Sequence, residues 1–455
     1  MIRFMQSVKR ARLRTALAVL AAIALVLVSL AYYEWHEMTL PPVERLGLDA
    51  TYPQMPADAR HHYLNLPIDY QDPESPLFRA FYILSPNFKV GGAVVFFLTD
   101  GQMELVTPSS SPAFFESELP GLSYVLIGHR GHAPTLFPEV YVDGKPDLRR
   151  ALRFYGSSAR VEDIEQVRRD MLQKGMLPAG GRIMIFAASG AGVLAQQYLQ
   201  RYGDRVSRVM LVSTGAPDLS LARGWDYARA FGDYDAAAAK VFEEVARKGK
   251  VPLESLSYML FQLGRQGASG RDAAHDVVNG LQGHNRLPYL WQWMHPGQNW
   301  PLARKMLTLP AAEAVKVRMF ELLAADLRKS QVTANASAPL MYPWATRLLA
   351  DYLHADLETP AWHIDRSAYH GEVLVVAGLG DIVFSPRVGE AIAAAYGGRF
   401  LAVPGGHRLE QDPGYQAALR SAFFAHGLHA PQTEALLASP PGFPLRATRR
   451  VVMRR

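Results

Sequence analysis

The chain has 455 residues, 49% of them hydrophobic and 20% charged, which excludes a disordered or collagen-like protein and fits one enlarged domain or two. It contains no cysteine, which excludes a disulfide scaffold, a thiolate metal site and a cysteine nucleophile. The formal net charge is +6, but ten of the 48 basic residues lie in two acid-free terminal segments. The rest of the chain is acidic, so nucleic acid is not an expected partner.

The predicted elements begin with residues 16–33, an uncharged apolar segment of eighteen residues. At ~1.5 Å per residue, a helix of this length nearly spans a ~30 Å hydrocarbon core. Five basic residues and no acid precede it, so we expect residues 1–35 to anchor the chain in the inner membrane with the body in the periplasm. The alternative is a signal peptide, cleaved near Ser29-Leu30-Ala31, which would release the body into the periplasm.

The body alternates short apolar runs with segments of helical period. Runs rich in β-branched residues predict buried strands, and the segments between them predict helices that connect these strands in parallel. This alternation indicates the α/β class. The predicted strands are residues 93–98, 122–127, 182–186, 206–212, 372–377 and 399–403, and the predicted helices are 161–173, 190–202 and 413–425.

The alternation stops over residues 217–370, where no strand is predicted and helical segments dominate, among them 234–248, 311–329 and 344–355. We therefore expect a first core part at 36–216, a helical cap insertion at 217–370 and a second core part at 371–430. The last segment, 431–455, contains Pro440-Pro441 and five arginines, and it is predicted to be a basic, flexible tail.

The segment around Ser189 carries the clearest chemical signal. A predicted strand runs into Ala187-Ala188-Ser189-Gly190-Ala191, and a predicted helix follows. A nucleophile elbow needs this order, because its serine sits in a tight strand-to-helix turn where only small side chains fit. The usual pattern is G-x-S-x-G, whereas both outer positions here are alanine. The alternative role of such a serine is a helix N-cap.

Two further polar residues follow the last two predicted strands. Asp381 comes after a glycine-rich turn, and His407 comes twenty-six residues later, after Pro404-Gly405-Gly406. The carboxyl ends of parallel strands meet at one edge of a sheet, where open α/β sheets place their sites. Ser189, Asp381 and His407 are therefore expected to lie together as a candidate triad.

Several motifs resemble the α/β-hydrolases, specifically the prolyl and tripeptidyl aminopeptidase-like branch of serine peptidases. Residues 66–73, Leu-Pro-Ile-Asp-Tyr-Gln-Asp-Pro, are similar to that branch's V-P-L-D-Y-x-x-P opening strand. Gly128-His129-Arg130-Gly131 resembles its D-x-R-G turn after the fourth strand, and Val161-Glu162-Asp163-Ile164 resembles its V-x-D-I/L helix before the elbow. The resemblance covers residues 60–425 and implies an α/β-hydrolase fold with a helical cap.

The resemblance also implies roles for the candidate residues. Ser189 would be the nucleophile, His407 the general base and Asp381 the residue that orients and stabilises the imidazolium. The oxyanion hole would use the N–H groups of Gly190 and Gly101. The family's H-G-G-P-G is Thr99-Asp100-Gly101-Gln102-Met103 here, so Asp100 would oppose a developing oxyanion unless it points away or is neutralised.

Three functions remain open from the sequence. The first is an aminopeptidase that cleaves short peptides through an acyl-enzyme, with a cap acid such as Glu243, Glu244 or Glu321 binding the free amine. The second is a carboxylic-ester hydrolase with an apolar cap pocket, and the third is a non-catalytic binding protein of the same fold. No cofactor is expected. No metal is expected either, because His129 and His132 have no evident third ligand.

Overall fold

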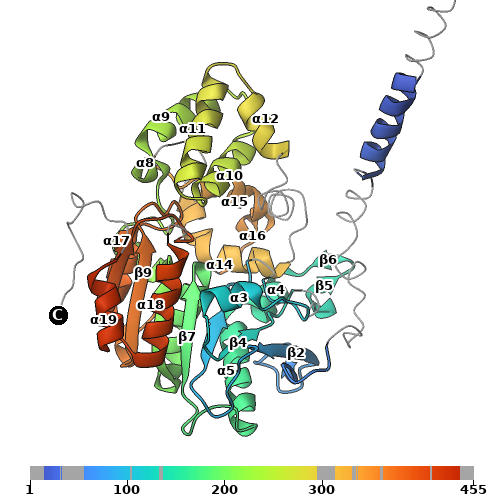
Figure 1. Ribbon diagram of the computed structural model, residues 1–455. Coiled ribbons are helices and arrows are strands. Elements are labelled where there is room, and N and C mark those ends of the chain that lie inside the picture. The colour runs from blue at the N-terminus through green and yellow to red at the C-terminus, as the bar shows by residue number, and fades with distance from the viewer. Residues whose placement is uncertain are drawn as a thin grey trace, which may run out of the picture.

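An eight-stranded sheet forms the centre of the computed structural model, which describes residues 15–30, 32, 56–102, 105–132, 137–294, 313–329, 335, 337–358, 362–409 and 412–440 (Figure 1). The strand order is β1-β2-β4-β3-β7-β8-β9-β10. Pairing is antiparallel between β1 and β2 and between β2 and β4, and all later pairs are parallel. The strands are β1 His61–Pro67, β2 Leu77–Leu84, β3 Val95–Leu98, β4 Tyr124–Ile127, β7 Ile183–Ala188, β8 Val206–Val212, β9 Glu372–Gly378 and β10 Arg399–Val403, and β5 Tyr141–Val142 and β6 Lys145–Pro146 form a separate ribbon.

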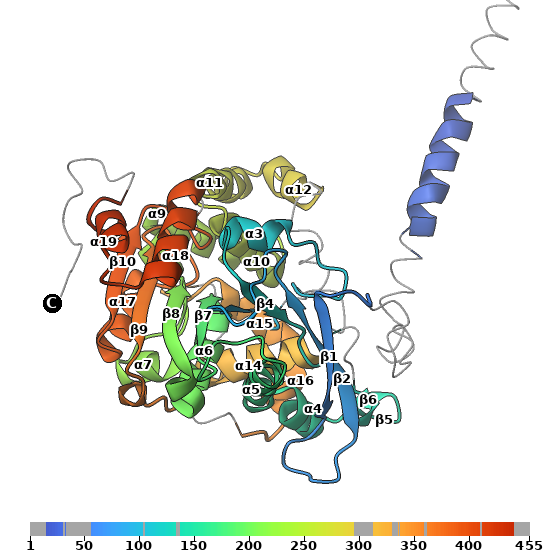
Figure 2. The same ribbon diagram turned by 60° about the horizontal axis from the view of Figure 1, so that its bottom comes forward.

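Helices cover both faces of the sheet because successive strand residues point to opposite sides. Phe96 and Ile185 pack with the helices of one face, and Phe97 and Phe186 with those of the other. The first face is covered by α5, α6 and α17, and the second by α3, α18 and α19 (Figure 2). These helices are α3 Ala113–Glu118, α5 Ser157–Gln173, α6 Gly190–Tyr202, α17 Pro386–Ala395, α18 Pro413–His426 and α19 Pro431–Ala438.

The predicted cap is helical in its described residues and stands above the carboxyl edge of the sheet. In Figure 1, α14 lies between the sheet and the group formed by α8 to α12. A single apolar cluster joins these helices to α4 Leu148–Tyr155 of the core. The helices of the insertion are α7 Pro217–Ala222, α8 Phe231–Tyr234, α9 Ala236–Arg247, α10 Leu253–Gly264, α11 Ala268–Gln282, α12 Leu287–Met294, α14 Glu313–Lys329, α15 Met341–Leu348 and α16 Ala350–His354.

Two predictions need correction. The predicted opening strand at residues 66–73 ends at Pro67, since residues 68–76 form the turn into β2, in which the Asp69 carboxylate accepts from Gln71 N at 3.0 Å. The sequence pattern does not predict β2 at all. The predicted flexible tail is also wrong for Pro431–Ala438, which form α19 against α18, while residues 441–455 lie outside the described residues.

The first predicted element is described in part. Residues 15–30 are helical and exposed along their length, whereas residues 1–14, 31 and 33–55 lie outside the described residues. Among the residues that the structure describes, no helix is both long enough and apolar enough to span a bilayer.

The three family-like motifs meet at one buried ion pair. Arg130 donates from Nη2 and Nε to the two Asp163 oxygens at 2.5 and 2.6 Å, and from Nη1 to the Ile68 carbonyl at 2.8 Å. The Tyr70 hydroxyl also donates to Asp163, at 2.8 Å. The motifs therefore mark a structural joint between the β1–β2 turn, the loop after β4 and α5.

This joint predicts a large stability loss on removal of one charge. Asp163→Ala leaves Arg130 buried without its carboxylate, so we expect the free energy of unfolding to fall by about 3–5 kcal/mol. Glu162→Gln, on the same helix but in the more exposed pair with Arg201, should cost less than about 1 kcal/mol. Denaturant unfolding measures both, and similar costs for the two variants would contradict the assignment of the joint.

Candidate active site

The candidate nucleophile sits in a strained turn between β7 and α6. Ser189 has φ +57° and ψ −134°, a conformation that is costly for a residue with a side chain and typical of a nucleophile elbow. Its N–H donates to the Val212 carbonyl at 2.9 Å, and its carbonyl accepts from Thr214 Oγ1 at 2.6 Å. The neighbouring strand β8 and the residues after it therefore hold the turn in place.

The elbow tolerates alanine at positions 187 and 191 because its tightest contacts are at positions 190 and 192. Ala187 and Ala191 are buried without needing to be glycine. A Cβ on Gly192 would overlap the Thr214 side chain, and a Cβ on Gly190 would overlap the Asp100 carboxylate. The two glycines that this turn requires are therefore Gly190 and Gly192, which explains the departure from G-x-S-x-G.

The structure brings the three predicted triad residues together. His407 Nε2 lies 3.0 Å from Ser189 Oγ, and His407 Nδ1 lies 3.1 and 3.0 Å from the two Asp381 oxygens. Asp381 is fully buried, and its Oδ1 accepts from the N–H groups of Val383 and Phe384 at 2.7 and 3.3 Å. Fixed donors thus orient the carboxylate, which in turn orients the imidazole toward the serine.

Arg160 and His132 fix the loop of the second predicted oxyanion donor. Arg160 Nη1 donates to the Asp100 carbonyl at 2.8 Å, and His132 Nε2 lies 2.7 Å from the Gly101 carbonyl. In a trans peptide the N–H points opposite to the C=O, so the Gly101 N–H faces away from Arg160. Gly101 has φ +75°, and a Cβ there would overlap the Arg160 guanidinium, so this position requires glycine.

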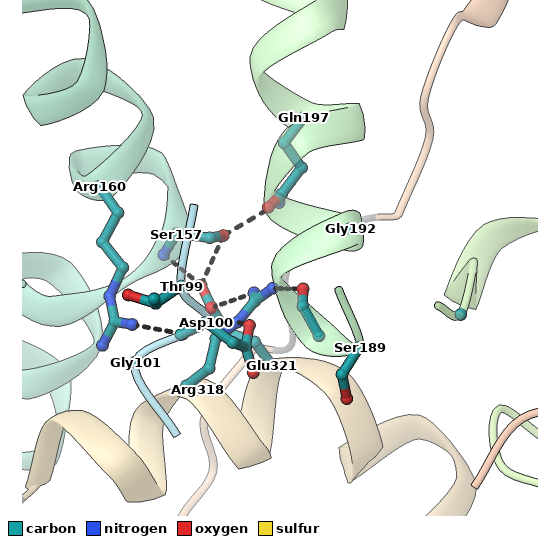
Figure 3. A network of polar contacts seen from close by, with 12 residues as sticks. Thr99, Asp100, Gly101, Ser157, Arg160, Ser189, Gly192, Gln197, Arg318 and Glu321 are labelled. Carbon is teal, nitrogen blue, oxygen red and sulfur yellow. Dashed lines mark hydrogen bonds and ion pairs between the residues drawn. The ribbon is translucent and has the colours of Figure 1, made fainter. Parts of the chain in front are cut away.

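Asp100 is neutralised by an arginine that comes from the cap. Arg318 on α14 is fully buried and donates from Nε to Asp100 Oδ1 at 2.7 Å. It also donates from Nη2 to the Gly190 carbonyl at 3.1 Å and from Nη1 to Glu321 at 3.1 Å. The predicted conflict between Asp100 and an oxyanion is thereby reduced, and in Figure 3 the Ser189 hydroxyl points away from this network.

The network continues into the core beyond Arg318. Glu321 Oε1 accepts from Ser157 N at 2.8 Å and from Ser157 Oγ at 2.9 Å, and Gln197 on α6 donates to that hydroxyl at 3.0 Å (Figure 3). Burial, followed by the charge of Arg318, lowers the pKa of Arg160 to about 10. Burial opposes the charge of Arg318 as well, but Asp100 and Glu321 raise its pKa overall.

His129 and His132 support this loop from the segment after β4. His129 Nε2 hydrogen-bonds Thr99 Oγ1, and burial lowers the pKa of His129 well below its usual value, so the ring is neutral. Across the described ranges, no group of three histidine or acidic side chains is placed to hold a metal ion.

The sequence does not predict that Arg160 and Arg318 bind the predicted oxyanion loop, or that Glu321 binds Arg318. Glu321 was considered only as an amine ligand, and neither arginine lies in a recognisable motif. The one available signal was Asp100 itself, since a carboxylate where glycine is usual requires a cation or a donor nearby.

The strand order, the strained serine turn after β7 and the helical insertion between β8 and β9 together define the α/β-hydrolase fold. No family model and no curated protein matches the sequence. Solved structures similar to the chain include an esterase from Thermogutta terrifontis, at 14% identity and TM-score 0.37 over 79% of this chain and 97% of that one. A Pseudomonas aeruginosa hydrolase has 15% identity and TM-score 0.35 over 80% and 98% of the two chains. A 2-hydroxy-6-oxo-6-phenylhexa-2,4-dienoate hydrolase from Rhodococcus has 12% identity and TM-score 0.38 over 77% of this chain and 94% of that one.

The packing of Asp100 on Gly190 gives a specific prediction. Gly190→Ala places a methyl group against the buried carboxylate, so we expect a loss of about 1–3 kcal/mol in stability. The shift also moves a predicted oxyanion donor, which should lower turnover of an activated ester by up to about 10²–10³-fold. Gly414→Ala, at an exposed position of α18 with only ordinary contacts, should leave turnover unchanged and should cost no stability, because alanine favours a helix over glycine.

A double variant identifies the carboxylate as the cause. If the methyl meets Asp100, the cost of Asp100→Gly combined with Gly190→Ala is smaller than the sum of the single costs. Strict additivity would mean that Gly190 is required for its backbone alone.

Proposed function

We propose that this protein is a serine hydrolase that cleaves carboxylic esters through an acyl-enzyme. The observation that carries the proposal is the hydrogen-bonded series Ser189–His407–Asp381, with 3.0 Å at the serine and 3.0 Å at the nearer aspartate oxygen. A serine that serves only as a helix cap needs neither the strained elbow nor a buried histidine–aspartate pair. These features also support a catalytic function over a non-catalytic binding function.

The geometry gives each residue a step. His407 Nε2 accepts the Ser189 proton while Oγ attacks the ester carbonyl, and the ion pair with Asp381 stabilises the resulting imidazolium. The N–H groups of Gly190 and Gly101 are proposed to stabilise the oxyanion. His407 then protonates the leaving alkoxide, and water repeats the sequence on the acyl-enzyme to release the acid and restore Ser189.

An ester fits the surroundings of the triad better than the peptide amine of the aminopeptidase hypothesis. That hypothesis needs a carboxylate free to bind a protonated amine. Glu321 is already engaged by Arg318 and Ser157, and Glu244 on α9 pairs with Lys248, which follows that helix. Arginines lie close to Asp381, among them Arg229, whose Nη1 donates to the Asp381 carbonyl at 2.7 Å.

The first test of the proposal is the nucleophile. Ser189→Ala should abolish fluorophosphonate labelling and ester hydrolysis, because it removes the attacking oxygen, while the melting temperature stays within a few degrees. Ser220→Ala, at a buried serine whose hydroxyl has no hydrogen-bond partner, should keep both activities. Labelling that persists in Ser189→Ala would place the chemistry on another residue, and faster cleavage of aminoacyl arylamides than of acyl esters would favour the aminopeptidase.

We also propose that the exposed apolar helix at residues 15–30 belongs to a membrane anchor that holds the body in the periplasm. The full chain should then sediment with membranes and resist an alkaline wash, and a carboxyl-terminal reporter that functions only in the periplasm should be active. A soluble product beginning near Tyr32 would instead indicate a cleaved signal peptide.

A further inference from the structure

Most buried arginines of the described residues pair with carboxylates, and Arg160, which does not, donates to three backbone carbonyls instead. Such pairing is expected, because a buried charge without a partner is costly. In four arginines whose side chains are at most 5% exposed, a guanidinium nitrogen lies within 3 Å of a carboxylate oxygen. The pairs are Arg130–Asp163, Arg168–Glu165, Arg318–Asp100 and Arg366–Asp218.

Arg265 departs from this pattern. It follows the last residue of α10 in the cap, it is only partly exposed, and no carboxylate of the described residues lies within ion-pair distance of it. Within the described residues its guanidinium makes a single, long hydrogen bond, from Nη1 to Gln262 Oε1 at 3.4 Å. Its Nε is buried and has no partner, and its guanidinium lies 5.8 Å from the centre of the Phe261 ring.

Arg265 is held beside the triad loops. The preceding residue, Gly264, packs so closely on Ile382, the neighbour of Asp381, that a Cβ at position 264 would overlap the Ile382 side chain. Burial, followed by the charge of Arg408, lowers the pKa of Arg265 to about 10. Arg408 directly follows His407, so the charge that opposes Arg265 comes from the loop that carries the candidate histidine.

Resting on the proposed function, we propose that Arg265 binds a carboxylate group of the substrate, so that the preferred substrates are esters that carry a free carboxylate, such as half-esters of dicarboxylic acids. A guanidinium donates in a planar fork that matches a carboxylate, which is the partner that Arg130 and Arg366 take in this chain. The substrate would supply the counter-charge that the protein does not. Arg265 would thus select the substrate, while Ser189, His407 and Asp381 cleave it.

The test compares two esters of similar size with the full-length enzyme. The mono-4-nitrophenyl ester of glutaric acid carries a carboxylate, and 4-nitrophenyl valerate is its neutral counterpart. The unmodified enzyme should favour the glutarate ester in kcat/KM. Arg265→Gln should reduce that preference by about 10-fold or more, mainly through KM, because it removes a charge-assisted hydrogen bond. Arg265→Lys should retain part of the preference, and high salt should weaken it.

A matched control is Arg271→Gln on α11, where the arginine stacks on Tyr234 at 4.7 Å and lies 3.8 Å from Asp235. This variant should keep the preference for the glutarate ester. Equal kcat/KM for both esters in the unmodified enzyme, or an equal loss on both in Arg265→Gln, would overturn the proposal.

A binding measurement separates this proposal from the proposed function. Calorimetry with monomethyl glutarate on Ser189→Ala should detect binding that weakens in Ser189→Ala combined with Arg265→Gln. Binding that depends on Arg265 without hydrolysis of either ester would overturn the ester hydrolase and support the carboxylate site. Hydrolysis without any such binding would overturn the carboxylate site alone.

Discussion

The ion pair between Arg318 and Asp100 is the interaction on which the arrangement of the candidate site depends. It joins three segments far apart in the chain: the oxyanion loop, the elbow through the Gly190 carbonyl, and cap helix α14. The carboxylate takes the space next to Gly190 that a side chain would otherwise fill, so Gly190 and Asp100 must be considered together. Breaking one member of such a pair leaves an uncompensated buried charge, which makes the pair costly to disrupt.

Because of this pair, cap helix α14 is bound tightly to the core, whereas the helices α8 to α12 are not held by it. α14 cannot move away from the sheet without separating Arg318 from Asp100 and Glu321 from Ser157, so it behaves as part of the core. The helices α8 to α12 lie farther from the sheet (Figure 1). This part of the cap meets the triad loops through Gly264 of α10, which packs on Ile382, and through Arg229, just before α8, which donates to the Asp381 carbonyl. The position of the predicted oxyanion loop is therefore set by α14, whereas the outer helices contact the triad loops.

The sequence predicts what local patterns encode. Ser189 lies between a continuous apolar strand and a helix, and the order Ser, Asp, His at strand ends predicts that the three side chains lie together. The hydrogen-bond distances in the structure agree with this prediction. The partners of Asp100 have no such pattern, because Arg318 and Arg160 lie within helices and follow no strand end, whereas Ser189 and His407, which are also 218 residues apart, both do. The motif at residues 66–73 does not form a strand beyond Pro67, because the Ile68 carbonyl and the Tyr70 hydroxyl bind the Arg130–Asp163 pair instead.

The charged side chains around the triad affect which substrate charge, positive or negative, is favoured. Asp381 is already occupied by His407 and by two backbone donors, so it offers little attraction to a substrate cation. Arg229, Arg265 and Arg408 remain nearby. At an effective dielectric constant of ~20, two unit charges ~8 Å apart interact by about 2 kcal/mol, which for a protonated amine and an arginine is repulsive. A carboxylate at the same distance from an arginine gains that amount. This is the electrostatic argument for the proposed preference for an anionic ester over a free peptide amine, and it depends on residues outside the triad.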